Sequence, residues 1–417
     1  RELYGIGERL TSLQLKPGFY TIFVINRSGL IDNGEQGLNQ EGHHPMYLVK
    51  ERSGKYHINL IRNLSPQEAI LREDTRVKWM LTGGVLDFNF FLGNNPKEVI
   101  EKYHRYCQGW VKPALWHLGA HINKWFGYRT VGELEFVLAH HKRLELPLDA
   151  LWSDIDIYDG HWNFVPNVTM FPSDQMKALY SKYQKKWIPV VDPFIMEEGL
   201  EKRKDVLAYS HPLLESIFLK DQKGRYCVGN GFFNRIRTID YLNPNASIYW
   251  SDILDELNKY CPLAGAWLDD NEVSVFREKD EIRKYKGREF WDMPYYPGGE
   301  NFYDLPLPNA NCLHHGNVYE HDIRSVTSLY QSIYTYNSLK KRSPFPFVLS
   351  RATMFGGAQY AYHWIPDTIS DWPTLRASIG TILTFQIFGY SFVSSDVCGF
   401  IGNNRTEPEL CARWYQS

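Results

Sequence analysis

Charged side chains recur at one kind of position in this sequence, directly after short runs of apolar residues. The residues at these positions are Asp154, Asp156, Asp192, Asp269, Asp270, Arg351 and Asp396. A carboxylate is costly inside a hydrophobic core, whereas two carboxylates that meet in a polar site can act as nucleophile and general acid. Trp152, Trp267 and Trp364 lie near them in the sequence. Aromatic walls around converging carboxylates favour sugar binding and glycosidic cleavage, although strand ends that merely meet solvent would also take polar residues.

The apolar runs that precede these residues alternate with helical patterns from about residue 114 onward. Strand-like runs at 148–152, 187–191, 263–268 and 345–349 are separated by stretches with apolar residues at helical spacing. Alternation of this kind predicts a parallel sheet, and its length suits a (β/α)8 barrel. Active sites of that fold lie at the carboxyl ends of the strands, so we expect the charged residues to face one site.

The part of the chain before the barrel has a different pattern. Runs at 21–25, 56–60 and 85–90 alternate or are rich in β-branched and aromatic residues, with glycines between them. This pattern predicts β structure. The domains that we expect are part of an N-terminal β-sandwich over 1–93, a helical linker over 94–113, and the barrel over 114–417.

Composition excludes some classes of partner. The 417 residues contain 46 Lys and Arg against 48 Asp and Glu, which gives a formal net charge of −2. Nucleic-acid-binding proteins and polybasic membrane-surface proteins need a basic footprint, so we expect neither a nucleic acid nor a membrane as partner. The longest apolar run, at 379–393, is interrupted by polar residues and falls short of the ~20 residues that a spanning helix needs.

Cysteines and glycosylation sequons bear on the cellular compartment. No Cys-x-x-Cys pair occurs, so we expect no structural zinc site. Cys398 and Cys411 are close enough in sequence to bridge a short loop. The Asn-x-Ser/Thr sequons lie at Asn26, Asn63, Asn167, Asn245 and Asn404. Together these features favour the secretory pathway, with a lysosomal or extracellular location.

Several short motifs follow one another along the whole chain. They are LYGIGE at 3–8, GHHPMYL at 42–48, GGVLDF at 83–88, LWSDIDI at 151–157, VDP at 191–193, AWLDDNEVS at 266–274, RAT at 351–353, HWIPD at 363–367 and SDVCGF at 395–400. In this order and spacing the motifs resemble those of glycoside hydrolase family 31, the α-glucosidase family. The resemblance covers essentially the whole chain.

The resemblance implies a retaining glycosidase mechanism. Asp269 would be the catalytic nucleophile and Asp367 the general acid/base. Retaining enzymes hold two such carboxyl groups ~5–5.5 Å apart. Asp367 would protonate the glycosidic oxygen while Asp269 attacks the anomeric carbon, and the ionised Asp367 would then activate the water that releases the glycosyl-enzyme ester.

The resemblance also implies a set of substrate-binding residues. Asp154, Arg351 and Asp396 match positions that hydrogen-bond the hydroxyls of the terminal glucose. The other implied substrate-binding residues are the wall aromatics Trp125, Trp267, Trp364 and Phe400, together with Val190 and Asp270. Two carboxyl groups suffice for this chemistry, so we expect no cofactor. The paired histidines of the chain lack a His-Glu-x-x-His arrangement, so we expect no metal.

The sequence departs from the family pattern at several positions. Asp270 replaces a methionine beside the nucleophile, Pro366 replaces a glycine before the acid/base, and Phe126 looks like an insertion. The segment around 232–233 lacks the usual Trp-Pro-Gly. Any of these could shift substrate choice or mark a non-catalytic relative. The family's barrel continues past residue 417, so we expect this piece to be truncated before its last strand and, alone, poorly stable and poorly active.

We therefore expect an exo-acting retaining α-glucosidase that removes terminal glucose from α-linked oligosaccharides or glucans. Other activities of the same site stay open, namely α-xylosidase, α-glucan lyase and transglucosidase. A non-catalytic carbohydrate-binding relative also stays open. The four matched acids are all present, which argues against lost catalysis, whereas Asp270 and Pro366 argue mildly for it.

Overall fold

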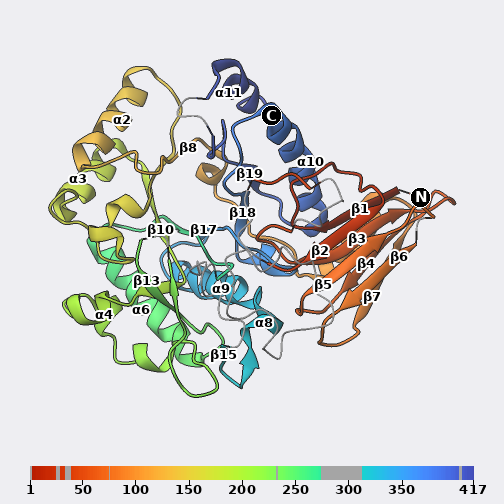
Figure 1. The fold of residues 1–417 in the computed structure, drawn as a ribbon. Coiled ribbons are helices and arrows are strands. Elements are labelled where there is room, and N and C mark those ends of the chain that lie inside the picture. The colour runs from red at the N-terminus through yellow and green to blue at the C-terminus, as the bar shows by residue number, and fades with distance from the viewer. Residues whose placement is uncertain are drawn as a thin grey trace.

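The computed structural model describes residues 2–24, 29–32, 39–74, 76–231, 233–273, 312–402 and 406–417. An antiparallel β region at the N-terminus lies beside a larger part in which strands and helices alternate (Figure 1). The predicted order of a β region followed by an α/β part is confirmed.

Two antiparallel sheets form the N-terminal region. The first holds, in spatial order, β1 (Glu2–Gly7), β3 (His44–Lys50), β4 (Tyr56–Ile61) and β7 (Phe88–Gly93). The second holds β2 (Gly18–Ile22), β5 (Gln67–Leu71) and β6 (Val77–Leu81). Successive side chains of a strand point to opposite faces, so one face of each sheet can be apolar. Leu3 and Val49 of the first sheet therefore meet Ile22 and Ala69 of the second in one buried cluster.

Helix α1 (Pro96–Tyr106) follows the last strand of this region. A proline occupies its first turn, where the missing N–H costs no hydrogen bond. The Asn95 side chain caps the helix by accepting a hydrogen bond from the Glu98 amide at 2.9 Å. Val99 and Tyr103 are fully buried in a cluster shared with the first sheet. The exact domain boundaries on either side of this helix stay a prediction.

Seven parallel strands form the sheet of the barrel, and the predicted fold class is confirmed. In spatial order, which is also their order in the chain, they are β8 (His121–Ile122), β9 (Ala150–Ser153), β10 (Lys186–Val191), β14 (Gly265–Leu268), β17 (Phe347–Ser350), β18 (Tyr362–Ile365) and β19 (Val393–Ser395). The longer helices are α2 (Val131–Arg143), α3 (Ser173–Tyr183), α6 (Pro244–Tyr260), α9 (Val326–Lys340), α10 (Trp372–Phe388) and α11 (Pro408–Trp414). In the described part of the chain, no helix is long and apolar enough to cross a membrane.

Shorter elements decorate the loops of the barrel. A small antiparallel sheet holds β11 (Phe194–Met196), β13 (Arg235–Thr238) and β12 (Val228–Asn230), and a hairpin holds β15 (Leu313–His314) and β16 (Val318–Tyr319). The short helices are α4 (Gly199–Lys202), α5 (Leu207–Ser210) and α8 (Glu320–Ile323). These elements extend the loops that follow the barrel strands, which is where a barrel builds its site.

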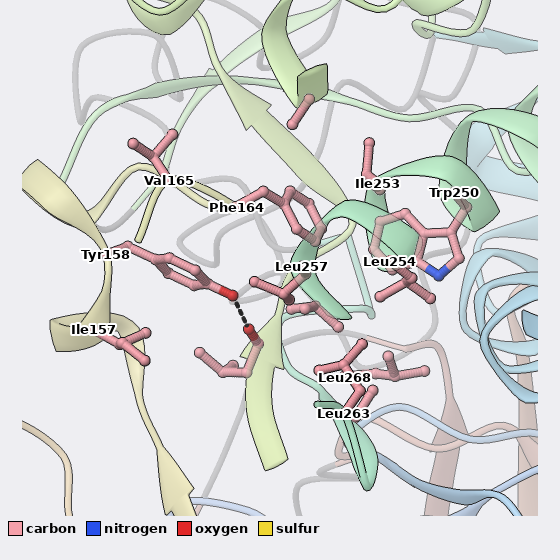
Figure 2. Packing of buried hydrophobic residues seen from close by; sticks show 14 of the residues in the cluster. Ile157, Tyr158, Phe164, Val165, Trp250, Ile253, Leu254, Leu257, Leu263 and Leu268 are labelled. Atoms are coloured by element: carbon pink, nitrogen blue, oxygen red, sulfur yellow. Dashed lines mark hydrogen bonds between the residues drawn. The ribbon is translucent and has the colours of Figure 1, made fainter. Parts of the chain in front are cut away.

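The largest buried cluster lies between the barrel strands and their helices. In it, Trp250 and Leu257 of α6 pack with Phe164 and Leu268 (Figure 2). The Trp250 indole N–H donates to the hydroxyl of Thr335 on α9 at 2.8 Å, so its single polar atom is satisfied inside the core. Close packing of this kind resists shifts of one strand past the next, and it fixes the register on which the site depends.

Buried polar contacts join the N-terminal region to the barrel. The His44 ring stacks on Phe388 of α10, with ring centroids 4.4 Å apart. Glu8 Oε1 and His363 Nε2 of β18 lie 2.9 Å apart, and both side chains are fully buried. Removing one partner would leave the other buried polar group without this hydrogen bond, which is destabilising. The two regions therefore share both a core and a buried Glu–His contact.

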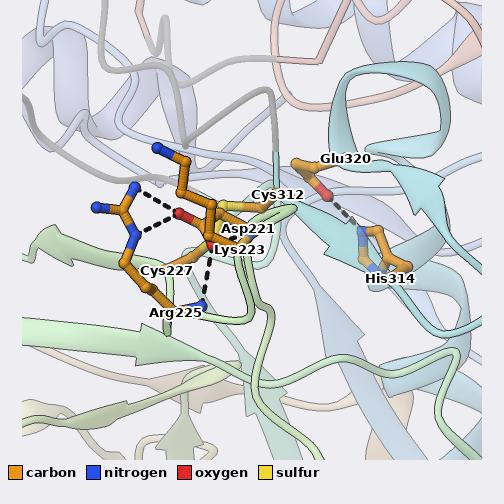
Figure 3. The surroundings of a disulfide bond; sticks show 7 residues. All are labelled: Asp221, Lys223, Arg225, Cys227, Cys312, His314 and Glu320. Carbon is orange, nitrogen blue, oxygen red and sulfur yellow. Dashed lines mark hydrogen bonds and ion pairs between the residues drawn. A yellow bond between two sulfur atoms is a disulfide. The ribbon is translucent and has the colours of Figure 1, made fainter.

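Two disulfide bonds lie in the barrel part of the chain. Cys398–Cys411 is the bond that the sequence predicts. Nothing in the sequence spacing indicates the second bond, Cys227–Cys312, because 85 residues separate its two cysteines (Figure 3). Closing so long a loop removes much freedom from the unfolded chain, and the bond anchors the start of β15.

A buried histidine lies two residues beyond this disulfide. His314 Nδ1 is 2.7 Å from Asp240 Oδ1. On its other side, Nε2 is 2.6 Å from Glu320 Oε2 (Figure 3). Burial alone would lower the pKa of His314, but the hydrogen bonds to Asp240 and Glu320 raise it to about 9. The imidazole is therefore a cation at neutral pH, and it ties the β15–β16 hairpin and the start of α8 to the loop before α6.

The asparagine side chain of one glycosylation sequon is buried in the structure. Asn63 is 2% exposed, and its side-chain nitrogen donates to two main-chain carbonyls at 2.9 and 2.8 Å. In the folded protein this side chain is therefore occupied by contacts with the chain, so Asn63 gives little support to the compartment expected from the sequons. Asn167 and Asn245 are partly exposed. Asn26 and Asn404 lie outside the described residues.

Candidate active site

The register of the barrel sheet places the predicted site residues at one edge. The last residues of β10, β14 and β17 are paired across the sheet. The residues that follow them, Asp192, Asp269 and Arg351, therefore emerge next to one another. The last residues of β18 and β19 are also paired, and Asp367 and Asp396 follow within two residues. Parallel pairing alone thus brings charged residues as far apart in the chain as Asp192 and Asp396 to one edge of the sheet.

Arg351 joins the two predicted catalytic carboxylates. Its Nη1 donates to Asp269 Oδ1 at 3.0 Å, and its Nη2 donates to Asp367 Oδ2 at 2.9 Å. The Arg351 side chain is 4% exposed, whereas those of Asp269 and Asp367 are 24% and 25% exposed. The two carboxylates therefore share one buried guanidinium on one side and remain reachable from the other.

Two further carboxylates, from Glu41 and Glu272, lie close to the same guanidinium. Glu41 Oε1 lies 3.6 Å from Arg351 Nη2, and Glu272 Oε1 lies 3.4 Å from Arg351 Nε. Both glutamate side chains are fully buried. Glu41 comes from the N-terminal region, so that region contributes directly to the electrostatics of the site. A guanidinium held by several carboxylates is fixed in position and always charged.

Burial and neighbouring charges raise the pKa of several carboxyl groups of the site. Burial raises the pKa of Asp154 to about 7, against hydrogen bonds from Asn123 and the Ile155 amide that lower it. Burial together with the charge of Asp367 raises the pKa of Asp396 to about 8. Protonated carboxyl groups can donate hydrogen bonds as well as accept them, which suits binding of sugar hydroxyls.

The carboxyl groups nearest to Asp269 show the same effect. Burial raises the pKa of Asp269, and the Arg351 charge opposes that rise. Burial and the charge of Asp269 raise the pKa of Asp270 well above its usual range. Burial and the charge of Asp270 do the same for Asp192. Burial therefore disfavours the ionised form of Asp270, the departure from the family pattern, beside the predicted nucleophile Asp269.

The loop that carries Asp269 is held in an unusual backbone conformation. Asp270 has φ +47° and Val273 has φ +63°, and a left-handed conformation is uncommon for any residue other than glycine and rarest for a β-branched one. Arg324 donates to the main-chain oxygens of Glu272 and Val273 at 3.2 and 3.4 Å. Strained backbone persists only where its surroundings over-determine it. Arg324 supplies that constraint here.

The predicted aromatic residues fall into two groups. The Trp267 ring lies 5.7 Å from that of Trp364, and these residues lie within β14 and β18, just before Asp269 and Asp367. The Trp125 ring lies 5.6 Å from that of Phe400, and these two are 41% and 46% exposed. Val190 is different, because it is fully buried in the main core cluster and none of its side chain is exposed.

Some residues of the site carried no signal in the sequence. Glu41 lies just before the GHHPMYL motif at 42–48, but nothing in the sequence relates Glu41 to Arg351. Arg324 sits on the turn between α8 and α9, and only the fold brings it to the loop after β14. Asp192, by contrast, was expected from the sequence as a strand-end carboxylate, and the register places it next to Asp269.

This arrangement has the parts for acid–base and nucleophilic chemistry on a neutral substrate. An accessible carboxylate pair shares a fixed cation, and neighbouring acids hold protons near neutral pH. Among the described residues, no group of three or more His, Cys, Asp or Glu side chains could hold a metal ion.

Residues 111–417 match the family model for the TIM-barrel domain of glycosyl hydrolases family 31. The chain belongs to this family. Lysosomal alpha-glucosidase of Mus musculus is 30% identical over 419 residues, which cover 100% of this chain and 43% of that protein. Alpha-xylosidase 1 of Arabidopsis thaliana is 29% identical over 450 residues, covering 99% of this chain and 47% of that protein. The family 31 chain thus spans less than half the length of these relatives.

Solved structures of the family show the same fold. The Tris-bound glucosidase II alpha subunit matches with a TM-score of 0.82 at 24% identity, over 100% of this chain and 44% of that one. The family 31 alpha-glucosidase from Bacteroides thetaiotaomicron matches with a TM-score of 0.78 at 18% identity, over 99% and 63% of the two chains. At these identities the likeness concerns the fold.

Proposed function

We propose that this family 31 chain carries the catalytic site of a retaining exo-α-glucosidase. The observation that supports this most directly is the Arg351 guanidinium, which hydrogen-bonds Asp269 and Asp367 at once. Two accessible carboxylates that share one fixed cation are held close together, as a retaining mechanism requires. Similarity to both an alpha-glucosidase and an alpha-xylosidase supports an α-linked sugar as substrate.

The proposed mechanism assigns one role to each carboxylate. Asp367 gives its proton to the glycosidic oxygen, and Asp269 attacks the anomeric carbon to form a glycosyl-enzyme ester. Asp367, now ionised, takes a proton from a water that hydrolyses this ester. Asp154, Arg351 and Asp396 would hold the hydroxyls of the terminal sugar, and the exposed face of Trp125 with Phe400, Trp267 and Trp364 would form the walls.

The test is the stereochemistry of the first product. The natural full-length protein is incubated with an aryl α-glucoside and with maltose, and proton NMR follows the anomer of the released glucose. We expect α-glucose first, with mutarotation later, and no release from Asp269→Ala. Initial β-glucose would contradict a retaining mechanism, and undiminished turnover by Asp269→Ala would contradict the assignment of the nucleophile.

Parallel substrates separate the remaining alternatives. An aryl α-xyloside cleaved faster than the matching glucoside would indicate an α-xylosidase. An unsaturated anhydro sugar in the NMR spectrum would indicate a lyase, and longer oligosaccharides formed from maltose would indicate a transglucosidase. A folded protein that binds maltose without releasing glucose would indicate a non-catalytic relative.

We also infer that the protein passes through the secretory pathway. Its two disulfide bonds suit an oxidising compartment, and the matched mouse relative is named as lysosomal. Separation of the protein on a gel with and without reducing agent, after extraction with a thiol-blocking reagent, tests this inference. Free thiols at all six cysteines would contradict it.

A further inference from the structure

The segment of the N-terminal region that carries Glu41 is bonded to the chain just after Arg351. The His43 amide donates to the main-chain oxygen of Thr353 at 2.7 Å. In return, the Phe355 amide donates to the main-chain oxygen of His43 at 3.3 Å. These two main-chain hydrogen bonds fix the backbone beside Glu41 relative to the loop that follows β17.

A second set of contacts holds the residue just before Arg351. The His363 ring lies between Glu8 and Ser350, with Nε2 2.9 Å from Glu8 Oε1 and Nδ1 3.2 Å from the main-chain oxygen of Ser350. The Glu8 amide donates to the main-chain oxygen of Gly42 at 3.1 Å. A Cβ atom on Gly42 would lie 2.8 Å from the Cβ atom of Glu8, so this close approach needs a glycine. The N-terminal region therefore holds the chain on both sides of Arg351.

Glu41 adds a buried charge between these two sets of contacts. Its Oε1 lies 3.6 Å from Arg351 Nη2, the same nitrogen that donates to Asp367 Oδ2 at 2.9 Å. The Glu41 side chain is fully buried, so salt and water screen its attraction to the guanidinium little. Nη2 thus lies between a carboxylate of the N-terminal region and the predicted acid/base. A planar guanidinium that is held at both ends keeps one orientation.

Asp269 faces charged groups from its own loop and from the ends of the neighbouring strands. Besides Arg351, they are Asp154, Asp192, Asp270, Glu272, Asp367 and Asp396. Each of these six acids, when ionised, disfavours the ionised form of Asp269, whereas Arg351 favours it. Close to Glu41, burial lowers the pKa of His43 to about 4 and that of His44 well below its usual range. Both rings are therefore uncharged at neutral pH, and Glu41 acts on Asp269 through Arg351.

We propose that Glu41 is a positioning residue for the reaction. Its carboxylate holds the Arg351 guanidinium in the orientation that bridges Asp269 and Asp367, and its negative charge offsets part of the charge of Arg351. This inference rests on the proposed glycosidase function and adds to it a residue from outside the barrel. Without the charge of Glu41, Arg351 favours the ionised form of Asp269 more strongly.

The test is the pH dependence of kcat/KM for an aryl α-glucoside between pH 4 and 9, in the natural full-length protein. Glu41→Gln keeps the shape of the side chain and removes its charge. We expect kcat to fall about tenfold and the acid limb to move to lower pH by about half a unit or more. Glu41→Asp keeps the charge but withdraws it from Arg351, so we expect a lower kcat with the acid limb near that of the wild type. A purely structural role would lower the rate without moving either limb.

Glu68→Gln is the matched control. Glu68 of β5 is also a buried glutamate of the N-terminal region, 5% exposed, and it accepts a hydrogen bond from the Thr21 hydroxyl at 3.5 Å. We expect this variant to keep the wild-type rate and acid limb. Circular dichroism and urea unfolding show whether each variant is folded. If Glu41→Gln does not fold, a lowered kcat in Glu41→Asp with an unmoved acid limb supports the inference, and a wild-type kcat overturns it.

Further outcomes separate this inference from the proposed function. Turnover with an unmoved acid limb in Glu41→Gln overturns the positioning role and leaves the function standing. Without turnover, titration calorimetry over the same pH range follows the Kd of a basic iminosugar of gluco configuration, whose ammonium group binds ionised carboxylates. An acid limb of binding that moves to lower pH in Glu41→Gln then supports the positioning role, and an unmoved limb overturns it. Absence of both turnover and iminosugar binding overturns both proposals.

Discussion

Replacement of Arg351 by lysine should lower kcat/KM on an aryl α-glucoside about 10- to 100-fold. The guanidinium makes one hydrogen bond to Asp269 at 3.0 Å and another to Asp367 at 2.9 Å. A lysine ammonium is a point charge that cannot reproduce the two-pronged geometry. We therefore expect the loss of one hydrogen bond to a charged group, which is worth about 1.5–3 kcal/mol, and each 1.36 kcal/mol is tenfold in rate.

Replacement of Arg351 by methionine should be more damaging and should also change the pH dependence. It removes both hydrogen bonds, so we expect a loss of about 10²- to 10⁴-fold. Arg351 opposes the burial-induced rise in the pKa of Asp269, so its removal raises that pKa further. Because the nucleophile must be ionised, the acid limb of the rate profile should move to higher pH.

The assay is the initial rate between pH 4 and 9, with circular dichroism to confirm folding. Arg237→Lys is the matched control, because Arg237 of β13 forms an ion pair with Glu197 at 3.2 Å that is not part of the site. We expect it to keep the wild-type profile. Wild-type kcat/KM in Arg351→Lys, or an acid limb that stays in place in Arg351→Met, would refute the bridging role.

Three other substitutions test separate parts of the structure. Asp270→Asn should change kcat/KM at pH 7 less than about threefold, because burial and the charge of Asp269 already favour the neutral form of Asp270. A loss of 100-fold would show that its charge is needed. Arg324→Met should lower kcat about 10- to 100-fold with little change in KM, because it frees the loop of Val273 and loses hydrogen bonds worth about 1–3 kcal/mol. An unchanged kcat would contradict this. Arg324→Lys should recover part of the activity. His314→Gln should remove a stabilisation of about 3 kcal/mol that is complete below the ordinary pKa of 6.5 and is lost as the pH rises through about 9. Urea unfolding of the wild type and of His314→Gln at pH 6 and pH 10 measures the difference between their free energies of unfolding. An equal difference at the two pH values would contradict this prediction.

The sequence predicts those parts of the site that follow from local pattern and from parallel pairing. Asp192, Asp269 and Arg351 each follow a short apolar run, and in a parallel sheet the ends of such runs lie at one edge. The register confirms this juxtaposition. The pair Cys398–Cys411 was also predictable, because a short loop leaves few alternatives.

Contacts between distant segments could not be predicted in this way. Glu41 reaches Arg351 from the loop before β3, and Cys312 reaches Cys227 across 85 residues. Asn63 has the pattern of a glycosylation site, but its amide is used to bind the chain near Gly83. In each case the partner is chosen by the packing of whole elements, which leaves no periodic trace in the sequence.

The balance of charge around Arg351 explains how the site can hold protons at neutral pH. One guanidinium faces Asp269, Asp367, Glu41 and Glu272 within 3.6 Å, so full ionisation would leave a large excess of buried negative charge. Burial, together with these neighbouring charges, raises the pKa of Asp154 to about 7 and that of Asp396 to about 8. The N-terminal region supplies one of the four carboxylates, and it also pairs Glu8 with His363, four residues before Asp367. The β-sandwich portion is therefore part of the electrostatic environment of the site, so changes at its contact with the barrel should alter catalysis as well as stability.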